Sequence, residues 1–342
     1  MSDSKRLAVL GGGSFGTAIA NIAAEYGITT HLWMRNEQAV EEIKTGRKNQ
    51  KYLPDLILHK NLIPTTDLSK ALEGASLVFF AVPSKSFREV AKSIKGIIKP
   101  DQCVISTTKG IEPGTLNLMS DILKHELPEC ARGVMGGPNL AKEIARHELT
   151  ATVIASESSS LRKAVQAALG CSYFRVYASA DIYGVELGGA LKNIYAIMAG
   201  IVAAKKLGEN TTAMLLTRSL AEMGRFAEKQ GANPMTFLGL SGVGDLIATC
   251  SSPLSRNYRV GYAFGSGKSL EEAVEELGEV AEGVNTLVQV KRYADENDIY
   301  MPLVQGLYQM IYKQVSLSDV IKHLMAGEQN TDVEFTLSKD DV

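Results

Sequence analysis

Lys192 is the side chain whose surroundings in the sequence best suit proton transfer. It lies in the segment Glu186–Asn193, which has the composition of a helix. Four small residues share the lysine's side of that helix: Gly188, Gly189, Ala196 and Ala199. Each internal glycine costs a helix about 1 kcal/mol relative to alanine, so we expect a ligand or another helix to approach closely there. Partial burial would ease proton loss from this ammonium, as acid–base catalysis requires. The alternative is a structural lysine that reaches solvent or pairs with Glu186.

Two further segments of the second half place polar residues at expected helix starts. Asp245 follows the segment Leu240–Gly244, which contains two glycines. An acid in a first turn is stabilised by the helix dipole, so Asp245 has an ordinary structural explanation as well as a functional one. Ser255, Arg256 and Asn257 stand at the next start. Arginine can grip a phosphate through two parallel hydrogen bonds while serine and asparagine add single ones, so the triplet predicts an anion site. The alternative is simple N-capping by Ser255.

The segment Leu7–Thr17 carries a second kind of chemistry, the binding of a dinucleotide. Gly11, Gly13 and Gly16 have the G-x-G-x-x-G spacing, after an apolar strand and before an apolar helix that runs through Ala24. Gly11 permits the tight turn, Gly13 leaves room for a pyrophosphate against the backbone, and Gly16 allows close packing of helix and strand. Unpaired N–H groups at the helix start attract an anion. The alternative is a glycine-rich turn without a ligand.

Residues after two expected strands bear on the choice of cofactor and substrate. Arg35 follows the strand Thr30–Met34, and Glu37 lies two residues further on. An acid at this point favours NAD, whereas an arginine can take the 2′-phosphate of NADP, so Arg35 favours NADP without excluding NAD. Lys109 follows the strand Val104–Thr107. Beside a bound nicotinamide, this lysine could hold a substrate oxygen, and the alternative is a solvated loop lysine.

The elements that must position these residues change in character along the chain. The first half predicts strands at Leu7–Leu10, Thr30–Met34, Leu77–Val82, Val104–Thr107, Gly133–Met135 and Ala151–Ala155, separated by helices. This alternation indicates a parallel sheet with helices on both faces and ligands at the carboxyl ends of the strands. The second half predicts helices alone, at Ile182–Lys206, Thr211–Gln230, Leu270–Leu277, Ala281–Asn297, Leu303–Tyr312 and Leu317–Met325. No strand pattern is evident after about Val176.

We therefore predict an α/β fold: a Rossmann-type, mostly parallel sheet domain followed by an all-α C-terminal domain. The dinucleotide-binding domain spans 1–181, the helical substrate and catalytic domain spans 182–327, and a polar, acidic tail at 328–342 is expected to be flexible.

Composition excludes several other classes of protein. The net charge is -2 over 342 residues, which favours neither nucleic acid nor an anionic membrane as partner. The four cysteines lie far apart without a C-x-x-C pair, so we expect reduced thiols, no metal site and a cytoplasmic location. Strand residues begin by Leu7, which argues against a signal peptide. The long apolar stretch Ile182–Ala204 contains Glu186 and Lys192, so it predicts a buried helix and no integral membrane segment.

Six segments together resemble the bacterial-type, NAD(P)-dependent glycerol-3-phosphate dehydrogenase family over essentially the whole chain. They are Gly11–Thr17, Thr107–Gly110, Gly136–Ala141, Glu186–Asn193, Gly242–Asp245 and Ser255–Asn257. Their order matches the family, which makes the set far more specific than any single motif.

The resemblance implies a role for each matching residue. Lys192 would be the proton acceptor in the oxidative direction. Cofactor contacts would come from Ser14, Phe15, Arg35, Lys109, Ala141, Arg256, Val280 and Glu282, besides the three glycines. Substrate contacts would come from Lys109, Gly137, Asn139, Lys192, Asp245, Ser255, Arg256 and Asn257. Many relatives have serine or threonine where this chain has Asn139, but an asparagine can still donate and accept hydrogen bonds.

The resemblance also implies the reaction, namely reversible reduction of dihydroxyacetone phosphate to sn-glycerol 3-phosphate with NADPH or NADH, at the head of glycerophospholipid synthesis. One alternative is another dehydrogenase with a Rossmann and a helical domain, of the 3-hydroxyacid or 6-phosphogluconate type. A second is a non-catalytic nicotinamide sensor, which would not need the lysine, the acid and the anion site together. The apolar helices of the second half are compatible with a homodimer.

Overall fold

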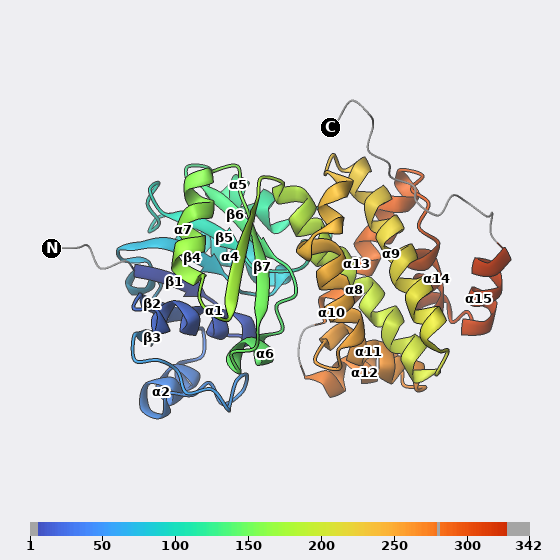
Figure 1. Ribbon diagram of the computed structural model, residues 1–342, viewed down its shortest axis with the longest axis horizontal. Coiled ribbons are helices and arrows are strands. Elements are labelled where there is room, and N and C mark those ends of the chain that lie inside the picture. The colour runs from blue at the N-terminus through green and yellow to red at the C-terminus, as the bar shows by residue number, and fades with distance from the viewer. Residues whose placement is uncertain (1–5, 279–280, 327–342) are drawn as a thin grey trace. The chain divides into compact units, whose positions relative to one another are not determined.

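A computed structural model describes residues 6–278 and 281–326 of the chain. The tail predicted at 328–342 therefore lies outside the described residues, as does Val280. Contacts divide the chain into two compact units, the first made of Met1–Glu112 and Asn117–Glu186, the second of Pro113–Leu116 and Leu187–Val342. The predicted boundary at residue 181 falls directly before the helix α8, Ile182–Ala204, whose first residues belong to the first unit by contacts. Figure 1 shows strands in the blue-to-green half and helices alone in the yellow-to-red half.

The first unit is built on one eight-stranded sheet with the order β3-β2-β1-β4-β5-β6-β7-β8. Its strands are β1 Arg6–Leu10, β2 Thr29–Trp33, β3 Leu62–Thr65, β4 Ala75–Phe80, β5 Cys103–Ser106, β6 Arg132–Gly136, β7 Thr150–Ala155 and β8 Phe174–Ser179. All neighbours pair in parallel except β6 and β7, which are antiparallel. The mostly parallel sheet is confirmed, but the two outermost strands, β3 and β8, were not predicted, and β8 extends beyond Val176.

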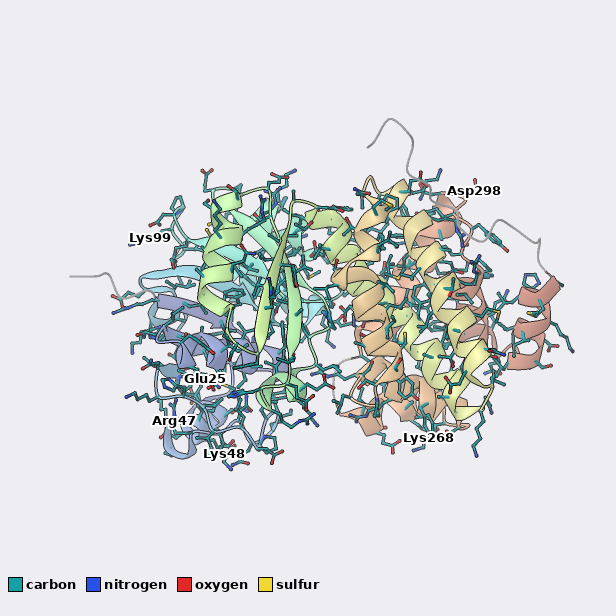
Figure 2. The ribbon with its side chains drawn as sticks, viewed as in Figure 1. Glu25, Arg47, Lys48, Lys99, Lys268 and Asp298 are labelled. Atoms are coloured by element: carbon teal, nitrogen blue, oxygen red, sulfur yellow. The ribbon has the colours of Figure 1, made fainter. Side chains whose placement is uncertain are left out.

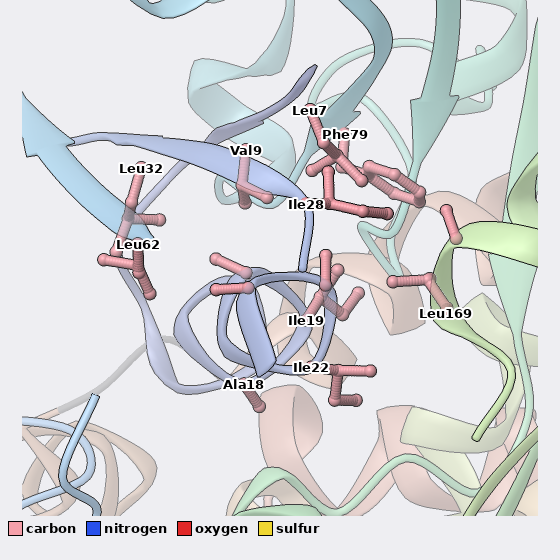
Figure 3. Close-up of a cluster of buried hydrophobic side chains, with 14 of the residues drawn as sticks. Leu7, Val9, Ala18, Ile19, Ile22, Ile28, Leu32, Leu62, Phe79 and Leu169 are labelled. Atoms are coloured by element: carbon pink, nitrogen blue, oxygen red, sulfur yellow. The ribbon is translucent and has the colours of Figure 1, made fainter. Parts of the chain in front are cut away.

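Helices cover both faces of this sheet because its strands are apolar on both sides. The helices are α1 Ser14–Glu25, α2 Glu37–Gly46, α3 Leu68–Leu72, α4 Ser84–Ile94, α5 Met119–Glu126, α6 Ala141–Ala145 and α7 Ser159–Leu169. Leu7 and Val9 of β1 pack with Ile19 and Ile22 of α1 (Figure 3). Ala8 and Leu10 pack on the other face, with α4 and α5. Side chains alternate between the two faces of the sheet along β1, and this alternation determines the face on which α1 packs. It thereby also places the glycine turn that precedes this helix.

The second unit consists of helices in its described part. They are α8, α9 Glu209–Lys229, α10 Asp245–Ser251, α11 Arg256–Gly265, α12 Leu270–Leu277, α13 Glu282–Glu296, α14 Pro302–Lys313 and α15 Leu317–Ala326, with short 3₁₀ and π turns at Pro234–Leu238 and Leu240–Gly244. Helix α8 is long and apolar enough to cross a membrane by length and composition, but 78% of its most apolar window is buried in the protein. It is the core helix predicted from the sequence. Charged side chains such as Lys268 and Asp298 lie on the outside of this unit (Figure 2).

Glu222 of α9 places a carboxyl group inside the helical unit. It accepts hydrogen bonds from the backbone N–H groups of Leu303 (2.5 Å) and Val304 (3.3 Å), at the start of α14, and from the Tyr195 hydroxyl (3.1 Å). Burial raises the pKa of this carboxyl to about 7. The group therefore joins α8, α9 and α14 at the cost of holding an acid away from water.

We expect this burial to make stability depend on pH. Because the folded pKa is raised, the native state keeps a proton that the unfolded chain releases, so the free energy of unfolding falls as pH rises from about 4.5 through about 7. The loss should reach about 3 kcal/mol. In Glu222→Gln the side chain does not titrate, so urea unfolding of the variant at pH 5 and pH 8 should show a smaller difference than in the parent. Glu228→Gln, on the exposed side of α9, is the control, and an equal change in both variants would contradict the assignment.

Candidate functional site

Different physical reasons explain why each of three positions in the turn between β1 and α1 is a glycine. Gly11 has φ +122°, and a Cβ there would lie 2.4 Å from the Ala81 carbonyl oxygen. A Cβ on Gly16 would lie 2.0 Å from the Gly11 oxygen. Gly13 differs, because a Cβ there would meet no atom of the described chain within 4 Å. Internal packing thus explains Gly11 and Gly16, whereas Gly13 faces open space where a ligand can approach.

The start of α1 fits a dinucleotide pyrophosphate. Gly13 is the N-cap residue and supplies no side-chain acceptor for the first amides of this 12-residue helix. Those amides, on Ser14, Phe15 and Gly16, lie at the positive end of the helix dipole. Room at Gly13 and donors at the helix start are together what a bound pyrophosphate requires.

Asn49 supports this turn and was missed in the sequence. Its amide nitrogen donates to the Gly12 carbonyl (2.9 Å) and to the Thr17 hydroxyl (2.9 Å), and the residue is buried. Asn49 lies in a loop far along the chain, and no local pattern marks it. Only the folded chain reveals that this amide holds the glycine turn in place.

We expect Gly13→Ala to weaken cofactor binding without harming the fold. A methyl group there meets no atom of the described residues within 4 Å, and alanine as N-cap costs the helix only about 1 kcal/mol. The KM for NADPH should rise at least about tenfold, since the methyl group would occupy space that the pyrophosphate needs, and the thermal midpoint should change little. Gly16→Ala is the contrasting variant. It should lower the thermal midpoint of unfolding, because its Cβ would clash with backbone atoms. Unchanged NADPH kinetics in a stable Gly13→Ala protein would count against the pyrophosphate site.

Arg35 lies two residues after the end of β2, because the strand ends at Trp33 and not at Met34 as predicted, and it is exposed on the first unit. Its side chain is 54% exposed and forms an ion pair with Glu89 of α4 (Nη2–Oε1, 3.2 Å). The next residue, Asn36, caps α2 by accepting from the Ala39 amide (2.9 Å). Glu37 is the first residue of α2 and exposed. An exposed pair is worth little energy, so Arg35 is held loosely enough to exchange Glu89 for a phosphate.

Lys109 and the turn after β6 are brought together by the fold. The Lys109 ammonium donates to the Gly137 carbonyl oxygen at 2.7 Å. Gly137 has φ +120°, a conformation that favours glycine. The Asn139 amide nitrogen donates to the Thr152 hydroxyl at 3.0 Å, and Ala141 begins α6. Two substrate residues predicted from separate segments are therefore neighbours in the first unit.

Lys192 is buried in the second unit, with 4% of its surface exposed. Its Nζ lies 3.1 Å from Asp245 Oδ1 and donates to the Thr249 hydroxyl at 2.5 Å. Thr249 in turn donates to the same Asp245 oxygen at 3.2 Å. The lysine thus neither reaches solvent nor pairs with Glu186. Asp245 is the first residue of α10, as its first-turn explanation predicted, but it is buried and also pairs with the lysine. Thr249 was missed, although its place four residues after Asp245 on one helix face was a usable signal.

Glu186 serves a different purpose, at the beginning of α8. It accepts from the Ser120 amide (3.1 Å) and the Ser120 hydroxyl (2.5 Å), at the start of α5. Burial raises the pKa of this carboxyl to about 8. Glu186 therefore joins the beginning of α8 to the start of α5, six residues before the lysine.

The close approach expected beside Lys192 is made by protein at Gly188. A Cβ on Gly188 would lie 2.3 Å from the Ser241 carbonyl oxygen. Ser241 belongs to the π turn Leu240–Gly244, which leads directly into α10 and Asp245. The glycine in α8 therefore lets the Asp245 segment come near enough for the ion pair with Lys192.

The predicted anion triplet lies at the start of α11. The Ser255 hydroxyl accepts from the Tyr258 amide (3.3 Å), so N-capping by Ser255 is confirmed. Asn257 is buried, and its amide oxygen accepts from the Gly283 amide (3.0 Å) in the first turn of α13. A Cβ on Gly283 would lie 2.5 Å from the Asn193 carbonyl oxygen.

Contacts therefore bring the triplet, the residue after Lys192, and the start of α13 with Glu282 into one cluster. Arg256 is half-buried at the first position of α11. The capping oxygen of Ser255 can still donate its hydroxyl proton, and the Asn257 amide nitrogen carries two further donors.

Fold and residues together define a class of protein. A Rossmann-type unit with a ligand-ready glycine turn, followed by a helical unit that buries a lysine against a carboxylate, has the parts of a nicotinamide-dependent dehydrogenase. The described residues contain no group of three or more His, Cys, Asp or Glu side chains that could hold a metal ion.

Comparison with known proteins gives the family. The profile of the NAD-dependent glycerol-3-phosphate dehydrogenase N-terminus matches residues 6–162, and that of the C-terminus matches residues 181–322. The chain belongs to this family.

Two relatives and one solved structure illustrate the similarity. A glycerol-3-phosphate dehydrogenase (NAD(P)+) of Pseudomonas aeruginosa is 56% identical over 335 residues, 98% of each chain. One from Acinetobacter baumannii is 55% identical over 337 residues, 98% of this chain and 94% of that protein. The crystal structure of a glycerol-3-phosphate dehydrogenase from Coxiella burnetii has a TM-score of 0.90 at 35% identity and covers 95% of this chain and all of its own.

Proposed function

We propose that this chain catalyses the reversible reduction of dihydroxyacetone phosphate to sn-glycerol 3-phosphate with NADPH or NADH. The observation that carries the proposal is the buried Lys192 ammonium, paired with Asp245 and hydrogen-bonded to Thr249. A buried cation held at two points is suited to stabilise and protonate an oxygen on which negative charge develops. The family to which the chain belongs supports the same reaction.

Lys192 acts as the general acid in reduction and as the general base in oxidation. When bound at the glycine turn, a reduced nicotinamide would supply the hydride for C2 of the substrate. As the C2 oxygen becomes negative, the Lys192 ammonium gives it a proton, so the products are the alcohol and the oxidised cofactor. Asp245 and Thr249 hold the lysine nitrogen in place. In the reverse direction the neutral amine takes the hydroxyl proton.

The phosphate end of the substrate is assigned to Ser255, Arg256 and Asn257. Arg256 supplies two parallel donors, and the start of α11 adds its dipole. Binding energy from this remote group positions the carbonyl for reaction. Lys109, held by the Gly137 carbonyl, provides a second positive charge toward the substrate. Gly137, Asn139, Ala141 and Glu282 complete the proposed contacts.

Arg35 is the residue that we expect to recognise the 2′-phosphate of NADPH. Its exposed position after β2 and its loose pair with Glu89 support this role. Arg35→Ala should raise the KM for NADPH about tenfold and leave that for NADH nearly unchanged, because only NADPH carries the phosphate. Lys44→Ala, an exposed cation on α2, is the control in the same two-cofactor assay. Equal losses with both cofactors would show that Arg35 does not set the preference.

We further propose a cytoplasmic enzyme that supplies glycerophospholipid synthesis and acts as a homodimer, with neither nucleic acid nor membrane as partner. The net charge of -2 and four free cysteines support this environment. Sedimentation at two protein concentrations tests the dimer.

The direct test is oxidation of each reduced cofactor, followed at 340 nm, with dihydroxyacetone phosphate as substrate. Turnover that requires both dihydroxyacetone phosphate and a reduced cofactor supports the proposal. Parallel reactions with 6-phosphogluconate or a 3-hydroxyacid and the oxidised cofactor test the alternative dehydrogenases. Preferred use of either would overturn the assignment, and tight NADPH binding without turnover of any substrate would favour a sensor.

A further inference from the structure

Thr152, near the middle of β7, is fully buried beneath the turn that follows β6. Its hydroxyl donates to the Gly136 carbonyl at 2.8 Å and accepts from the Asn139 amide nitrogen at 3.0 Å. A Cβ on Gly137 would lie 3.3 Å from Thr152 Cα. One side chain therefore hydrogen-bonds to the last residue of β6 and to Asn139, on either side of Gly137, whose carbonyl receives the Lys109 ammonium.

The Thr152 hydroxyl also decides which way the Asn139 amide points. Its own proton is used on Gly136, so the oxygen can only accept from Asn139. The amide nitrogen must then face Thr152, and the amide oxygen faces the opposite way. That oxygen, Asn139 Oδ1, is shielded from water and has no hydrogen-bond partner among the described residues.

A shielded carbonyl oxygen without a partner costs free energy, and such atoms are rare unless a ligand completes them. We infer that Thr152 is a positioning residue: through the Asn139 amide it presents one oriented acceptor to a donor group of a bound ligand. This inference rests on the proposed function. Two donors fit the acceptor, namely the carboxamide of the nicotinamide and the C1 hydroxyl of the substrate.

Thr152→Val tests the positioning role, because valine keeps the shape and loses both hydrogen bonds. We expect kcat/KM for dihydroxyacetone phosphate to fall at least about tenfold. Thr152→Ser restores the hydroxyl and should return kcat/KM to within about twofold of the parent. Thr150→Val is the matched control, because that hydroxyl lies on the same strand but donates to the Glu148 carbonyl. If the valine variant does not fold, Thr152→Cys takes its place, because a thiol forms only weak hydrogen bonds.

A double variant separates positioning from mere support of the fold. If Thr152 acts through Asn139, then Thr152→Val should add little to the loss caused by Asn139→Ala. Full additivity, or a parent-like kcat/KM in a folded Thr152→Val protein, would overturn the inference. Activity of the parent and of Thr150→Val in the same assay tests the proposed function separately.

Two analogues identify which ligand group donates a hydrogen bond to Asn139 Oδ1. Hydroxyacetone phosphate lacks the C1 hydroxyl, and the 3-acetylpyridine analogue of NADPH lacks the carboxamide N–H. In the parent, the analogue without the relevant donor should react at least about tenfold less efficiently than its natural counterpart, and Asn139→Ala should abolish that discrimination. If Asn139→Ala leaves both discriminations intact, Asn139 Oδ1 is not a ligand acceptor and the inference is wrong.

Discussion

Lys192→Met is expected to lower kcat for dihydroxyacetone phosphate at least about 100-fold, the usual contribution of a positioned acid–base group. Methionine has nearly the length of lysine and fills the same buried space, but it carries no proton. The substrate oxygen would then have to gain its charge without the Lys192 ammonium and without the proton that this group supplies. Because the loss falls on the chemical step, the Kd for NADPH, measured by fluorescence titration, should stay within about threefold.

The variant also leaves Asp245 buried without its cation, which can cost about 3–5 kcal/mol of stability. Thermal unfolding must therefore be recorded on the same preparation, and kinetics compared at a temperature where both proteins are folded. Lys205→Met, an exposed lysine just beyond the end of α8, is the control for removing a charge. Turnover near that of the parent in folded Lys192→Met would remove the lysine from the mechanism.

The sequence predicted the central strands because their signal is strong. The first four residues of the run Leu77–Val82 are buried and lie in β4 (Ala75–Phe80), at the middle of the sheet, although the strand begins and ends two residues earlier than predicted. The missed strands β3 and β8 are the two edges. Strand β3 contains Pro64, which lacks an amide donor, and β8 carries exposed residues at Arg175 and Tyr177, so it has no continuous apolar run. Edge strands are weakly marked in a sequence because only one neighbour and part of one face constrain them.

The residues of the candidate site likewise divide into those that the sequence predicted and those that it missed. Glycine spacing and lysine surroundings are local patterns, so Gly11–Gly16 and Lys192 could be found from neighbouring residues. The partners of these residues are set by tertiary structure. The Asp245–Lys192 pair joins segments more than fifty positions apart, and Asn49 reaches the glycine turn from another loop. Residue types alone left Asp245 and Ser255 with two explanations each. The structure places Asp245 in the first turn of α10, as the ordinary explanation predicted, and also pairs it with Lys192, and it confirms capping for Ser255.

Arg256→Ala should lower kcat/KM for dihydroxyacetone phosphate at least about 100-fold by weakening the grip on the phosphate. Two charge-assisted hydrogen bonds contribute about 3 kcal/mol or more together, and each 1.4 kcal/mol is a factor of ten. The neighbouring Arg259, exposed one turn further along α11, provides the control as Arg259→Ala.

Dihydroxyacetone, which lacks the phosphate, separates recognition from chemistry. Its low reactivity should be the same in the parent and in Arg256→Ala, because neither makes the phosphate contact with it. An equal fall for both substrates would instead show that Arg256 acts on the reacting carbon or on the cofactor. If the parent reduced dihydroxyacetone as well as its phosphate, the anion site at Ser255–Asn257 would be wrong, since binding at a remote group can promote the reaction only where that group is present.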